Sequence, residues 1–579
     1  MTFPIDSTNA TNPRNPNMKW KSSGIDRRLQ GLLSETFGVT PLFAQLLVNR
    51  GITSSEDARV FLFGDISSCH DPMLMKDMDK AVERIKKAVE KKEKILIYGD
   101  YDVDGVTSVA LLADIFKEMG AEFETFIPNR IDDGYGLNIQ AVSVALEDNV
   151  KLIVTVDCGI NSCEEVKFAA ERGIDVIITD HHEERISDKP NACAIVDPHQ
   201  KDCKYPFKHL AGVGVAYKLA RALMKGREDI ADRHLDLVAM GTIADVMPLV
   251  GENRILAKSG LKSLRGTGKH GIKALMEVAG VDQENITCRQ IGFALGPRIN
   301  AMGRIGSAGI ALDLLMSSDR QGAWELACRL DSENKNRQGI QKDILKHALD
   351  KIKTEVDLKE ENIIVLADEA WHPGIVGIVA SKITEEFSRP AILIALDGDE
   401  GKGSGRSVAG FDLLEAVGGA GRHLVGFGGH KQACGIRIKS ENIDLFRKDL
   451  NTSFKLDAQD SDMSEPELKV DLRIPLSHIG LKLVNELKLL MPYGPGNEEP
   501  VFSTGGISVK SVPRNIGASG FKFLAACGSQ TCEAITFRKS QVTRPVRGDV
   551  IDLAYAPSVN RWAGIETIQL NIKDLRIVN

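Results

Sequence analysis

A chain of 579 residues is too long for one hydrophobic core, because single cores rarely grow past about 250 to 300 residues, so several domains are expected. Its net charge of −7 excludes a broadly basic nucleic-acid coat, although it is compatible with a local basic groove. The polar start has no signal-peptide core, no apolar run reaches membrane length, and the ten cysteines are irregularly spaced. These features favour a reduced cytoplasm and no membrane association.

The first 74 residues are expected to form a tail and a small helical segment. Residues 1 to about 20 are rich in Asn, Pro, Ser and Thr and have the composition of disordered chain. From Pro41 to Phe63, apolar residues recur at helical spacing, which predicts small helices leading into the first domain.

Residues 75–317 alternate short apolar strands with helical stretches, which predicts a parallel α/β domain. Three of its strands end in acidic or histidine residues, in the segments 94–105, 153–157 and 176–182. Functional groups gather at the carboxyl ends of parallel strands, so acids distant in sequence should converge there.

The first of these segments reads K-I-L-I-Y-G-D-Y-D-V-D-G. Alternate side chains of an extended chain share a face, so its three acids should project together while Tyr101 and Val103 face away. Like charges this close repel strongly, and a multivalent cation is the simplest relief. Carboxylates select hard ions such as Mg²⁺ or Mn²⁺, and an added imidazole shifts the preference toward Mn²⁺ over Ca²⁺. Any single Asp here would more often be a helix N-cap or turn residue, but the full set favours a metal site with ligands for two ions.

A long polar helix is expected within residues 318–358, where apolar residues recur at three- and four-residue steps without proline. It would connect two lobes. A second α/β domain should follow over residues 359–457, and its glycine-rich segments, 403–407 and 428–435, suit close approach of the backbone to a phosphate. The alternative is that these glycines only form tight turns. Neither segment is a Walker A loop, so ATP hydrolysis is not supported.

The last domain, residues 466–579, should be a β-barrel, because about five short strands with alternating polarity suit an OB-fold. Cations beside aromatic rings are typical of surfaces that hold single strands without sequence preference. The candidates are Lys510, Arg514, Lys522, Arg538, Lys539 and Arg561, beside Phe521, Phe523, Phe537 and Trp562. The alternative for most of the phenylalanines is the barrel core, whereas Trp562 lies in a turn-like segment and is the better surface candidate.

Several motifs together resemble the DHH phosphoesterase superfamily. They are Asp180-His181-His182, G-D-Y-D-V-D-G from Gly99, V-D-C-G from Val156 and G-T-I-A-D-V-M-P-L from Gly241. Further segments are similar to the RecJ family of bacterial single-strand-specific 5′→3′ exonucleases: P-N-R-I-D-D-G-Y-G-L from Pro128, G-P-R-I-N-A-M-G-R from Gly296, W-H-P-G-I-V-G from Trp371, G-S-G-R-S from Gly403 and G-G-H-K-Q-A-C-G from Gly428. The likeness covers nearly the whole chain after the polar N-terminal stretch.

The resemblance implies a metal-dependent exonuclease that degrades single-stranded DNA 5′→3′ to 5′-mononucleotides in recombinational and mismatch repair. It implies two Mn²⁺ or Mg²⁺ ions, with Asp157 bridging them and Asp100 in or just outside the inner ligand set; the full set is Asp100, Asp102, Asp104, Asp157, His181 and Asp245. Such a pair, about 3.5 to 4 Å apart, activates a water and stabilises the leaving oxygen. Besides Asp157, the catalytic residues would be His182, donating to a phosphate oxygen, and Asp180, orienting a histidine.

The resemblance also implies the substrate contacts. Arg130, Ser404 and Arg406 would bind the 5′-terminal phosphate and thereby fix polarity, while Arg298, Asn300 and Arg304 would line the strand path; His430 is a further expected contact. The expected partners are single-stranded DNA, single-strand-binding protein and a RecQ-type helicase. The expected setting is a monomer in the bacterial cytoplasm, associated with the nucleoid during repair.

Three other classes of protein are compatible with parts of this pattern. A DHH phosphoesterase acting on short oligonucleotides or cyclic dinucleotides would not need the long connector or the C-terminal β-domain. A non-catalytic replication scaffold would be expected to have lost ligand residues, yet the expected acids and the His pair are all present. A DNA-binding protein with a structural metal would not need acids for two ions.

Overall fold

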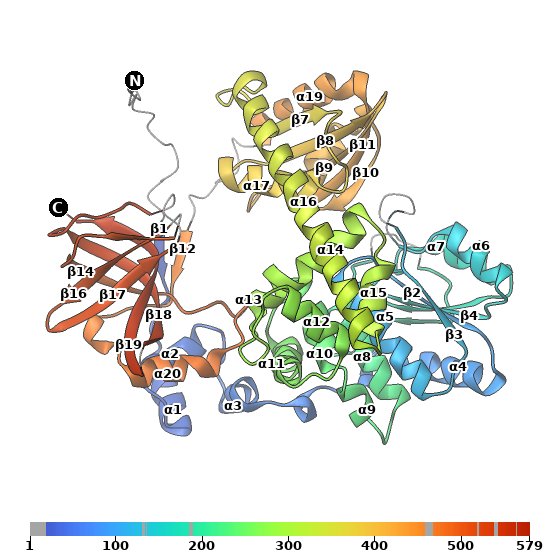
Figure 1. Ribbon diagram of the computed structural model, residues 1–579, viewed down its shortest axis with the longest axis horizontal. Helices are drawn as coiled ribbons and strands as arrows, with labels where there is room; N and C mark the ends of the chain where they lie inside the picture. The colour runs from blue at the N-terminus through green and yellow to red at the C-terminus, as the bar shows by residue number, and fades with distance from the viewer. Residues whose placement is uncertain are drawn as a thin grey trace. The chain divides into compact units, whose positions relative to one another are not determined.

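The computed structural model describes residues 19–129, 134, 136–184, 189–457, 467–517, 520–537, 542–562 and 564–578. The chain divides into two compact units. The smaller unit comprises Met1–Gly64 together with Ser464–Asn579, and the larger unit comprises Asp65–Met463. Figure 1 gives the element labels.

The larger unit begins with a parallel five-stranded sheet in the order β3-β2-β4-β5-β6. Its strands are β2 (Ile95–Gly99), β3 (Phe123–Phe126), β4 (Leu152–Val156), β5 (Asp175–Thr179) and β6 (Ala194–Val196). Alternate residues of β2 and β4 enter two different hydrophobic cores, so both strands are fully buried and read as continuous apolar runs. The parallel α/β class expected from the sequence is confirmed.

Helices cover both faces of this sheet. One core contains residues of α4 (Met78–Lys91), α5 (Val103–Glu118), α8 (Gly212–Leu223) and α10 (Leu235–Ala244). The other contains residues of α6 (Ile139–Glu147) and α7 (Cys163–Ala170). The short α9 (Asp229–Asp232) lies between α8 and α10. After α10 the chain forms α11 (Gly251–Arg265), α12 (His270–Val278), α13 (Cys288–Gln290), a π-helix (Ile291–Leu295), α14 (Gly296–Ile305) and α15 (Gly309–Met316).

The connector is one helix of 36 residues, α16 (Arg320–Glu355). Asp319 caps its start by accepting hydrogen bonds from the Gln321 and Gly322 N–H groups. The buried stripe of α16 joins the core of the parallel-sheet domain at Ala323, Ala327 and Leu330, and that of the next domain at Ile344, Ala348 and Ile352. Figure 1 shows α16 running from one domain to the other.

The second domain of this unit is built on a mixed sheet in the order β10-β11-β9-β8-β7. Its strands are β7 (Ile364–Asp368), β8 (Ala391–Asp397), β9 (Glu400–Arg406), β10 (Leu424–His430) and β11 (Ala433–Lys439). Only β7 and β8 are paired in parallel. α17 (Val376–Phe387) packs against β8 and β9, whereas α18 (Leu413–Gly419) and α19 (Ile443–Asp457) contribute to the core on the other face.

The smaller unit contains a closed β-barrel. β14 (Phe502–Val509) pairs with both β18 (Val550–Trp562) and β16 (Gly520–Cys527), and β19 (Ile565–Ile577) and β17 (Gln530–Thr536) complete the ring. These are the five strands that the sequence predicted, with the short β13 (Leu472–Arg473) and β15 (Arg514–Ile516) added at the edges. The OB-type barrel is confirmed.

The N-terminal helices belong to the barrel and not to the parallel-sheet domain. α1 (Arg27–Phe37), α2 (Pro41–Val48) and α3 (Ser55–Phe63) share one core with the barrel, and β1 (Lys19–Ser22) pairs with β12 (Glu467–Val470). α20 (Leu481–Leu487) packs against α2. This pairing of chain ends differs from the expected small segment leading into the first domain.

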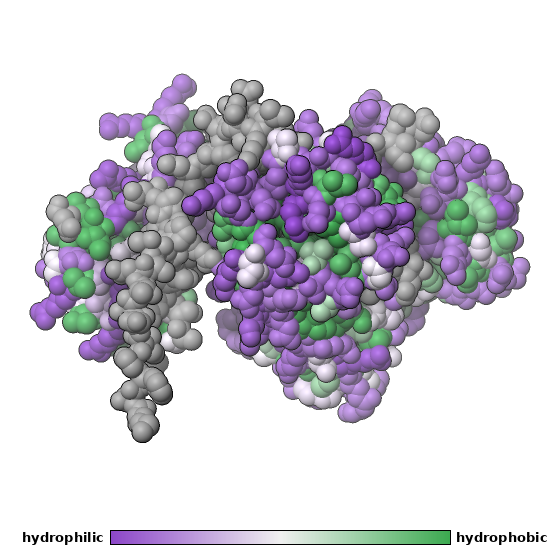
Figure 2. All heavy atoms as spheres, turned by 90° about the horizontal axis from the view of Figure 1, so that it is seen from above, coloured by the Kyte–Doolittle hydropathy of each residue, from purple (hydrophilic) through white to green (hydrophobic). Residues whose placement is uncertain are grey.

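Hydrophilic residues predominate on the face drawn in Figure 2, and hydrophobic residues gather there in small separate groups. Within the described residues, no single helix has the length and apolarity to cross a membrane. α1 and α2 reach that length only together, across a bend of 117°.

Candidate metal centre

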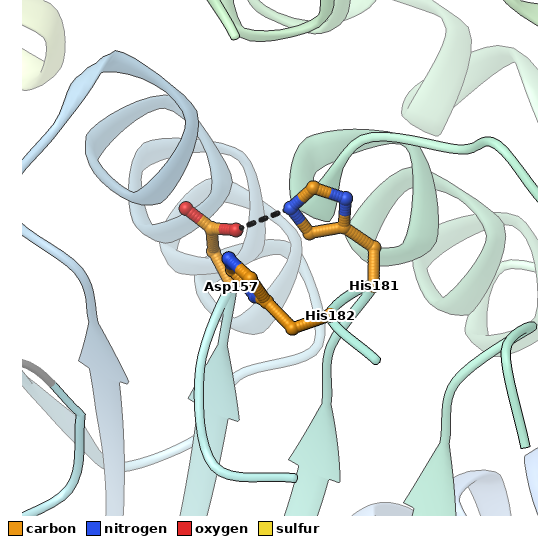
Figure 3. Close-up of side chains that lie close together, drawn as sticks. All are labelled: Asp157, His181 and His182. Atoms are coloured by element: carbon orange, nitrogen blue, oxygen red, sulfur yellow. Dashed lines mark ion pairs between the residues drawn. The ribbon is translucent and has the colours of Figure 1, made fainter. Parts of the chain in front are cut away.

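Acidic and histidine side chains converge at the carboxyl ends of β2, β4 and β5. β2 leads into Asp100, β4 into Asp157, and β5 into Asp180, His181 and His182. Figure 3 shows Asp157 and the two histidines beyond the ends of neighbouring strands, with their side chains gathered together. The fold therefore brings together residues that are 80 positions apart in the sequence.

The D-Y-D-V-D segment is not extended, which corrects the expectation that its three acids share one face of a strand. The strand ends at Gly99, and Asp102 is the N-cap of α5, accepting hydrogen bonds from the N–H groups of Asp104 (2.8 Å) and Gly105 (3.1 Å). A side chain at position 105 would meet the Asp100 backbone at 2.4 Å, so glycine is required for this tight turn. Tyr101 consequently lines the same cavity as Asp100 and Asp102 instead of facing away.

The acids and histidines form three groups, and within each group the potential ligand atoms lie within 4.8 Å of one another. The helical turn places Asp100 and Asp102 in one group and Asp104 in another. These groups are Asp100, Asp102 and Asp157; Asp104, His181 and Asp245; and Asp157, His181 and His182. His181 Nε2 lies 3.1 Å from Asp157 Oδ1, 3.7 Å from Asp245 Oδ2 and 3.8 Å from Asp104 Oδ2. Asp157 and His181 each belong to two groups. A neutral imidazole has one nitrogen lone pair to offer, whereas a carboxylate has two oxygens, so Asp157 is the shared residue whose chemistry suits a bridge between two ions.

Asp157 is held in a costly backbone conformation. Its φ is +61°, a left-handed value that non-glycine residues rarely adopt. Its Oδ1 is buried, and no hydrogen bond to it is made by the described residues. A side chain at Gly212 would come within 2.6 Å of that oxygen, so the glycine at the start of α8 leaves room for it. A buried carboxylate oxygen of this kind fits a cation, because carboxylate and imidazole donors suit Mn²⁺ or Mg²⁺.

The electrostatics of the cluster point the same way. Burial and the nearby Asp102 raise the pKa of Asp104 to about 7, although its carboxylate accepts hydrogen bonds from the N–H groups of Gly212 (2.6 Å) and Val213 (2.8 Å). Burial and Asp104 raise the pKa of Asp245 to about 8 and that of Asp157 well above its ordinary value. A divalent cation would favour the charged form of each acid and remove their mutual repulsion.

The two histidines have opposite electrostatic states. Burial and the neighbouring charged His182 lower the pKa of His181 to about 3, so its ring is neutral, as a metal ligand must be. Burial by itself lowers the pKa of His182, but the Asp180 carboxylate has a larger, opposite effect and raises that pKa to about 9. Asp180 Oδ1 lies 2.7 Å from His182 Nδ1. Burial would raise the pKa of Asp180, but the charged His182 outweighs burial and lowers it to about 2, and the Ile160 N–H adds a hydrogen bond at 3.0 Å. His182 is therefore a protonated donor whose ring is oriented by Asp180.

The centre opens into a cavity of about 210 Å³ lined by Asp100, Tyr101, Asp102, Asp157, His182, Asp245, Asn300 and Arg304. Asn300 and Arg304 come from α14; the Asn300 Oδ1 accepts from the Val103 N–H at 3.1 Å, and Arg304 Nη1 donates to the Gly374 carbonyl at 3.1 Å. Arg298 points elsewhere, pairing with Asp331 of α16 at 2.8 Å. Of the three α14 residues predicted to line the strand path, two thus line the cavity and one joins α14 to the connector.

Ser404 and Arg406 lie together in the mixed-sheet domain. Arg406 Nη1 donates to Ser404 Oγ at 3.0 Å, and a side chain at Gly377, in the first turn of α17, would come within 2.8 Å of that hydroxyl and 3.1 Å of Arg406 Nη2. Strand register aligns Arg406 with Ala433 and Ala433 with His430, so Arg406 and His430 face the same side two strands apart. A guanidinium, a hydroxyl and a helix N-terminus form an anion-binding arrangement. Arg130 lies outside the described residues.

Two contributors to the centre were missed from the sequence. Tyr101 lines the cavity because of the turn described above, and the α8 N-terminus holds Asp104 through two backbone N–H groups. The G-V-G-V run at Gly212, a glycine-rich start to an apolar helix, was the available signal for the second.

The barrel residues divide between core and surface. Phe521 and Phe523 are buried in the core, while Phe537 is exposed. Lys522 and Arg561 form ion pairs with Glu533 (2.7 Å) and Glu566 (2.8 Å), and Lys510 and Arg514 are exposed. Arg538, Lys539 and the Trp562 side chain lie outside the described residues.

A parallel sheet that carries its acids and a His pair at one edge, followed by a mixed-sheet domain, defines a protein of the DHH class. Family models agree: the DHH family N-terminal domain matches residues 94–242 and the DHHA1 domain matches residues 360–456. A third model, the RecJ OB domain, matches residues 470–574, and the chain belongs to the RecJ family.

Individual relatives agree with this assignment over nearly the full length. The chain is 40% identical over 569 residues to the Bacillus subtilis single-stranded-DNA-specific exonuclease RecJ, covering 97% of this chain and 71% of that protein. It is 33% identical to the Escherichia coli protein of the same name, covering 92% and 96%. The crystal structure of Thermus thermophilus RecJ in complex with Mn²⁺ superposes with a TM-score of 0.83 at 30% identity, covering 97% of this chain and 80% of that chain. A Mg²⁺ complex of the same protein gives a TM-score of 0.77 at 28% identity.

Proposed function

We propose that this chain is a metal-dependent exonuclease that degrades single-stranded DNA from its 5′ end to 5′-mononucleotides, using two divalent ions, Mn²⁺ or Mg²⁺. The observation that carries this proposal is the convergence of three groups of acids and histidines, linked through Asp157 and His181, beside one cavity that Asn300 and Arg304 also line. The relatives named as single-stranded-DNA-specific exonucleases, and the Mn²⁺ and Mg²⁺ complexes of one of them, support the substrate and the metals.

The ions would be held by Asp100, Asp102, Asp104, Asp157, His181 and Asp245. When bound, two such ions supply an activated water and charge stabilisation on both sides of the scissile phosphate. His182, kept protonated by Asp180, donates to a non-bridging phosphate oxygen and stabilises the charge that develops there. Arg304, on the same cavity wall, adds a fixed positive charge that favours entry of the phosphate.

Polarity follows from the neighbouring anion pocket. Ser404, Arg406 and the first turn of α17 offer a hydroxyl, a guanidinium and backbone N–H groups to a terminal phosphate, and Arg130 and His430 are proposed as further contacts. Arg304 bonds to Gly374, two residues before α17, which supports a short path between pocket and cavity. An end anchored there presents the first internucleotide phosphate to the metal centre, so cleavage proceeds from the 5′ end. The barrel, with its exposed cations, is proposed to hold the rest of the strand.

The cellular role is proposed from family membership. It comprises recombinational and mismatch repair, single-strand-binding protein and a RecQ-type helicase as partners, and a monomer in the bacterial cytoplasm that associates with the nucleoid. The rival substrate, a short oligonucleotide or cyclic dinucleotide, does not account for the barrel and the connector.

The test is product analysis on 5′-phosphorylated substrates with and without Mn²⁺. We expect mononucleotides to be released progressively from a long single strand in the presence of the metal, while a blunt duplex of the same sequence is spared. The proposal would be refuted by cleavage confined to dinucleotides or cyclic dinucleotides, or by nucleotides released first from the 3′ end.

A further inference from the structure

The two most exposed large apolar side chains among the described residues of the larger unit belong to segments that lead directly into or out of residues of the metal centre or its cavity. Phe293 is 82% exposed and Val246 is 66% exposed, more than any other large hydrophobic residue described between residues 65 and 463. Val246 directly follows the proposed metal ligand Asp245. A single exposed hydrophobic side chain is ordinary by itself, so the interest of Phe293 lies in its position, in the segment that leads into the cavity-lining helix α14.

Phe293 is presented by a π-helix that runs directly into α14. Ile291 and Leu295 anchor this π-helix in the core, and Phe293 between them points outward. Single π-turns are rare and occur frequently at functional sites. The extra residue in this turn interrupts the regular i→i+4 hydrogen bonding of an α-helix, and the residue exposed by the turn is Phe293.

The ring lies on the face of the helix that serves the cavity. Asn300 and Arg304, seven and eleven residues after Phe293, line the cavity, and residues at this spacing share one face of an α-helix. The extra residue of the π-turn rotates Phe293 from that face by at most about a quarter of a turn. Arg298 lies on a different face and pairs with Asp331 of α16. At about 1.5 Å per residue, Phe293 stands about 10 Å along the helix axis from Asn300.

Val246 supplies an independent sign of the same surface. It is β-branched yet has a φ of +60°, a genuine outlier for a residue of this type. It follows the C-terminus of α10, which packs against the π-helix. The fold therefore maintains a strained, exposed valine on the element next to the one that exposes Phe293.

The order of groups along α14 gives the ring a position relative to the strand. Phe293 lies in the π-helix just before the N-terminus of α14, and Asn300, in the middle of α14, lines the cavity. Arg304, near the C-terminus of α14, donates to the carbonyl of Gly374, which lies near the anion pocket of Ser404 and Arg406. If the 5′-phosphate occupies that pocket, the uncleaved part of the strand leaves the metal centre toward Phe293.

We propose that Phe293 stacks on a base on the 3′ side of the scissile phosphate, with Val246 adding an apolar contact beside Asp245. This inference rests on the proposed function and assigns to it a base contact near the reacting phosphate. A ring has no hydrogen-bonding preference and accepts every base, which suits an enzyme that must advance through any sequence. A protein partner is disfavoured as the occupant, because one seated on this face of α14 would obstruct the strand.

The test is a cycle that pairs Phe293→Ala with removal of single bases. The substrates are 5′-phosphorylated single strands in which the second, third or fourth nucleotide is abasic, so the backbone and its phosphates are retained. In the wild type, we expect one abasic position to lower kcat/KM by about 5- to 150-fold, the factor for loss of one base–aromatic stack. In Phe293→Ala, the intact strand should lose a similar factor and the same abasic position should cost nothing further. Phe293→Trp should retain the wild-type dependence, and Phe293→Leu should lose most of it.

Phe427→Ala is the matched control. This phenylalanine is also exposed in the larger unit, but it lies opposite Ile436 on the α18 face of the mixed sheet, away from Ser404 and Arg406. It should leave the abasic profile unchanged. The thermal unfolding of Phe293→Ala and the rise in its Tm on addition of Mn²⁺ should match the wild type, which separates a lost contact from a damaged fold or metal site.

The possible failures are distinguishable. If the wild type releases no nucleotides from single strands, the proposed function fails. If it is active but the effects of Phe293→Ala and of each abasic position multiply without coupling, the ring contacts no base and the inference is overturned. A loss in Phe293→Ala that is equal at every position, with normal Tm, would likewise overturn it and assign the ring to a protein contact.

Discussion

Replacing Arg406 with alanine should remove most of the preference for a 5′-phosphorylated end over a 5′-hydroxyl end. The guanidinium is already oriented, because Nη1 donates to Ser404 Oγ at 3.0 Å and to the Gly405 carbonyl at 2.7 Å. Little side-chain freedom remains to be lost on binding, so a charge-assisted contact to phosphate should be realised nearly in full.

The expected magnitude follows from the value of such a contact. A hydrogen bond to a charged group contributes about 1.5 to 3 kcal/mol, which corresponds to about 10- to 150-fold in kcat/KM. This factor should be lost for the 5′-phosphate strand. The 5′-hydroxyl strand should lose much less, because His182 and the acids at the metal centre are unchanged in the variant.

The assay compares kcat/KM for the two ends in wild type, Arg406→Ala and two reference variants. Arg406→Lys keeps the charge but loses the planar fork, so it should be intermediate. Lys402→Ala removes an exposed cation from the same face of β9, four residues earlier, and should affect both ends alike and weakly. An equal, large loss on both ends in Arg406→Ala would refute the assignment of this pocket to the terminal phosphate and the explanation of polarity built on it.

Asp157→Ala should abolish cleavage while much of the single-strand affinity persists in a gel-shift or anisotropy titration. The control is Asp313→Ala, on the exposed side of α15, which should leave cleavage unchanged. Near-normal turnover in Asp157→Ala would disprove the bridging role. The raised pKa values of Asp104 (about 7) and Asp245 (about 8) mean that the folded state binds more protons than the unfolded state above about pH 4. The stability of metal-free protein should therefore fall as pH rises toward 8, and the gain in Tm from Mn²⁺ should grow over the same range; a metal effect independent of pH would contradict this. A chain limited to residues 65–463 should still cleave short 5′-phosphorylated oligonucleotides but bind long strands more weakly, and unchanged affinity for long strands would show that the barrel serves another purpose.

Local patterns in the sequence predicted the fold class and most of the residues at the metal centre. Continuous apolar strands followed by acids, as at Asp157 and Asp180, predict parallel strands whose functional ends meet at one edge, because strand polarity is set by the chain itself. The five barrel strands were likewise readable from alternation with a period of two. These features depend on neighbours within a few residues, and the sequence contains that information directly.

Only the tertiary structure decided which of these residues act together. The turn at Asp102 distributes the acids of one short segment between two groups. The ion pair with Asp331 holds Arg298 away from the cavity. Helices near the N-terminus share a core with strands that follow more than 400 residues later. The exposure of Phe293 is of the same kind, since its neighbours Ile291 and Leu295 are buried and no local pattern distinguishes it from them. Such outcomes depend on which distant surfaces meet, and packing between elements determines this, whereas periodicity within one element does not.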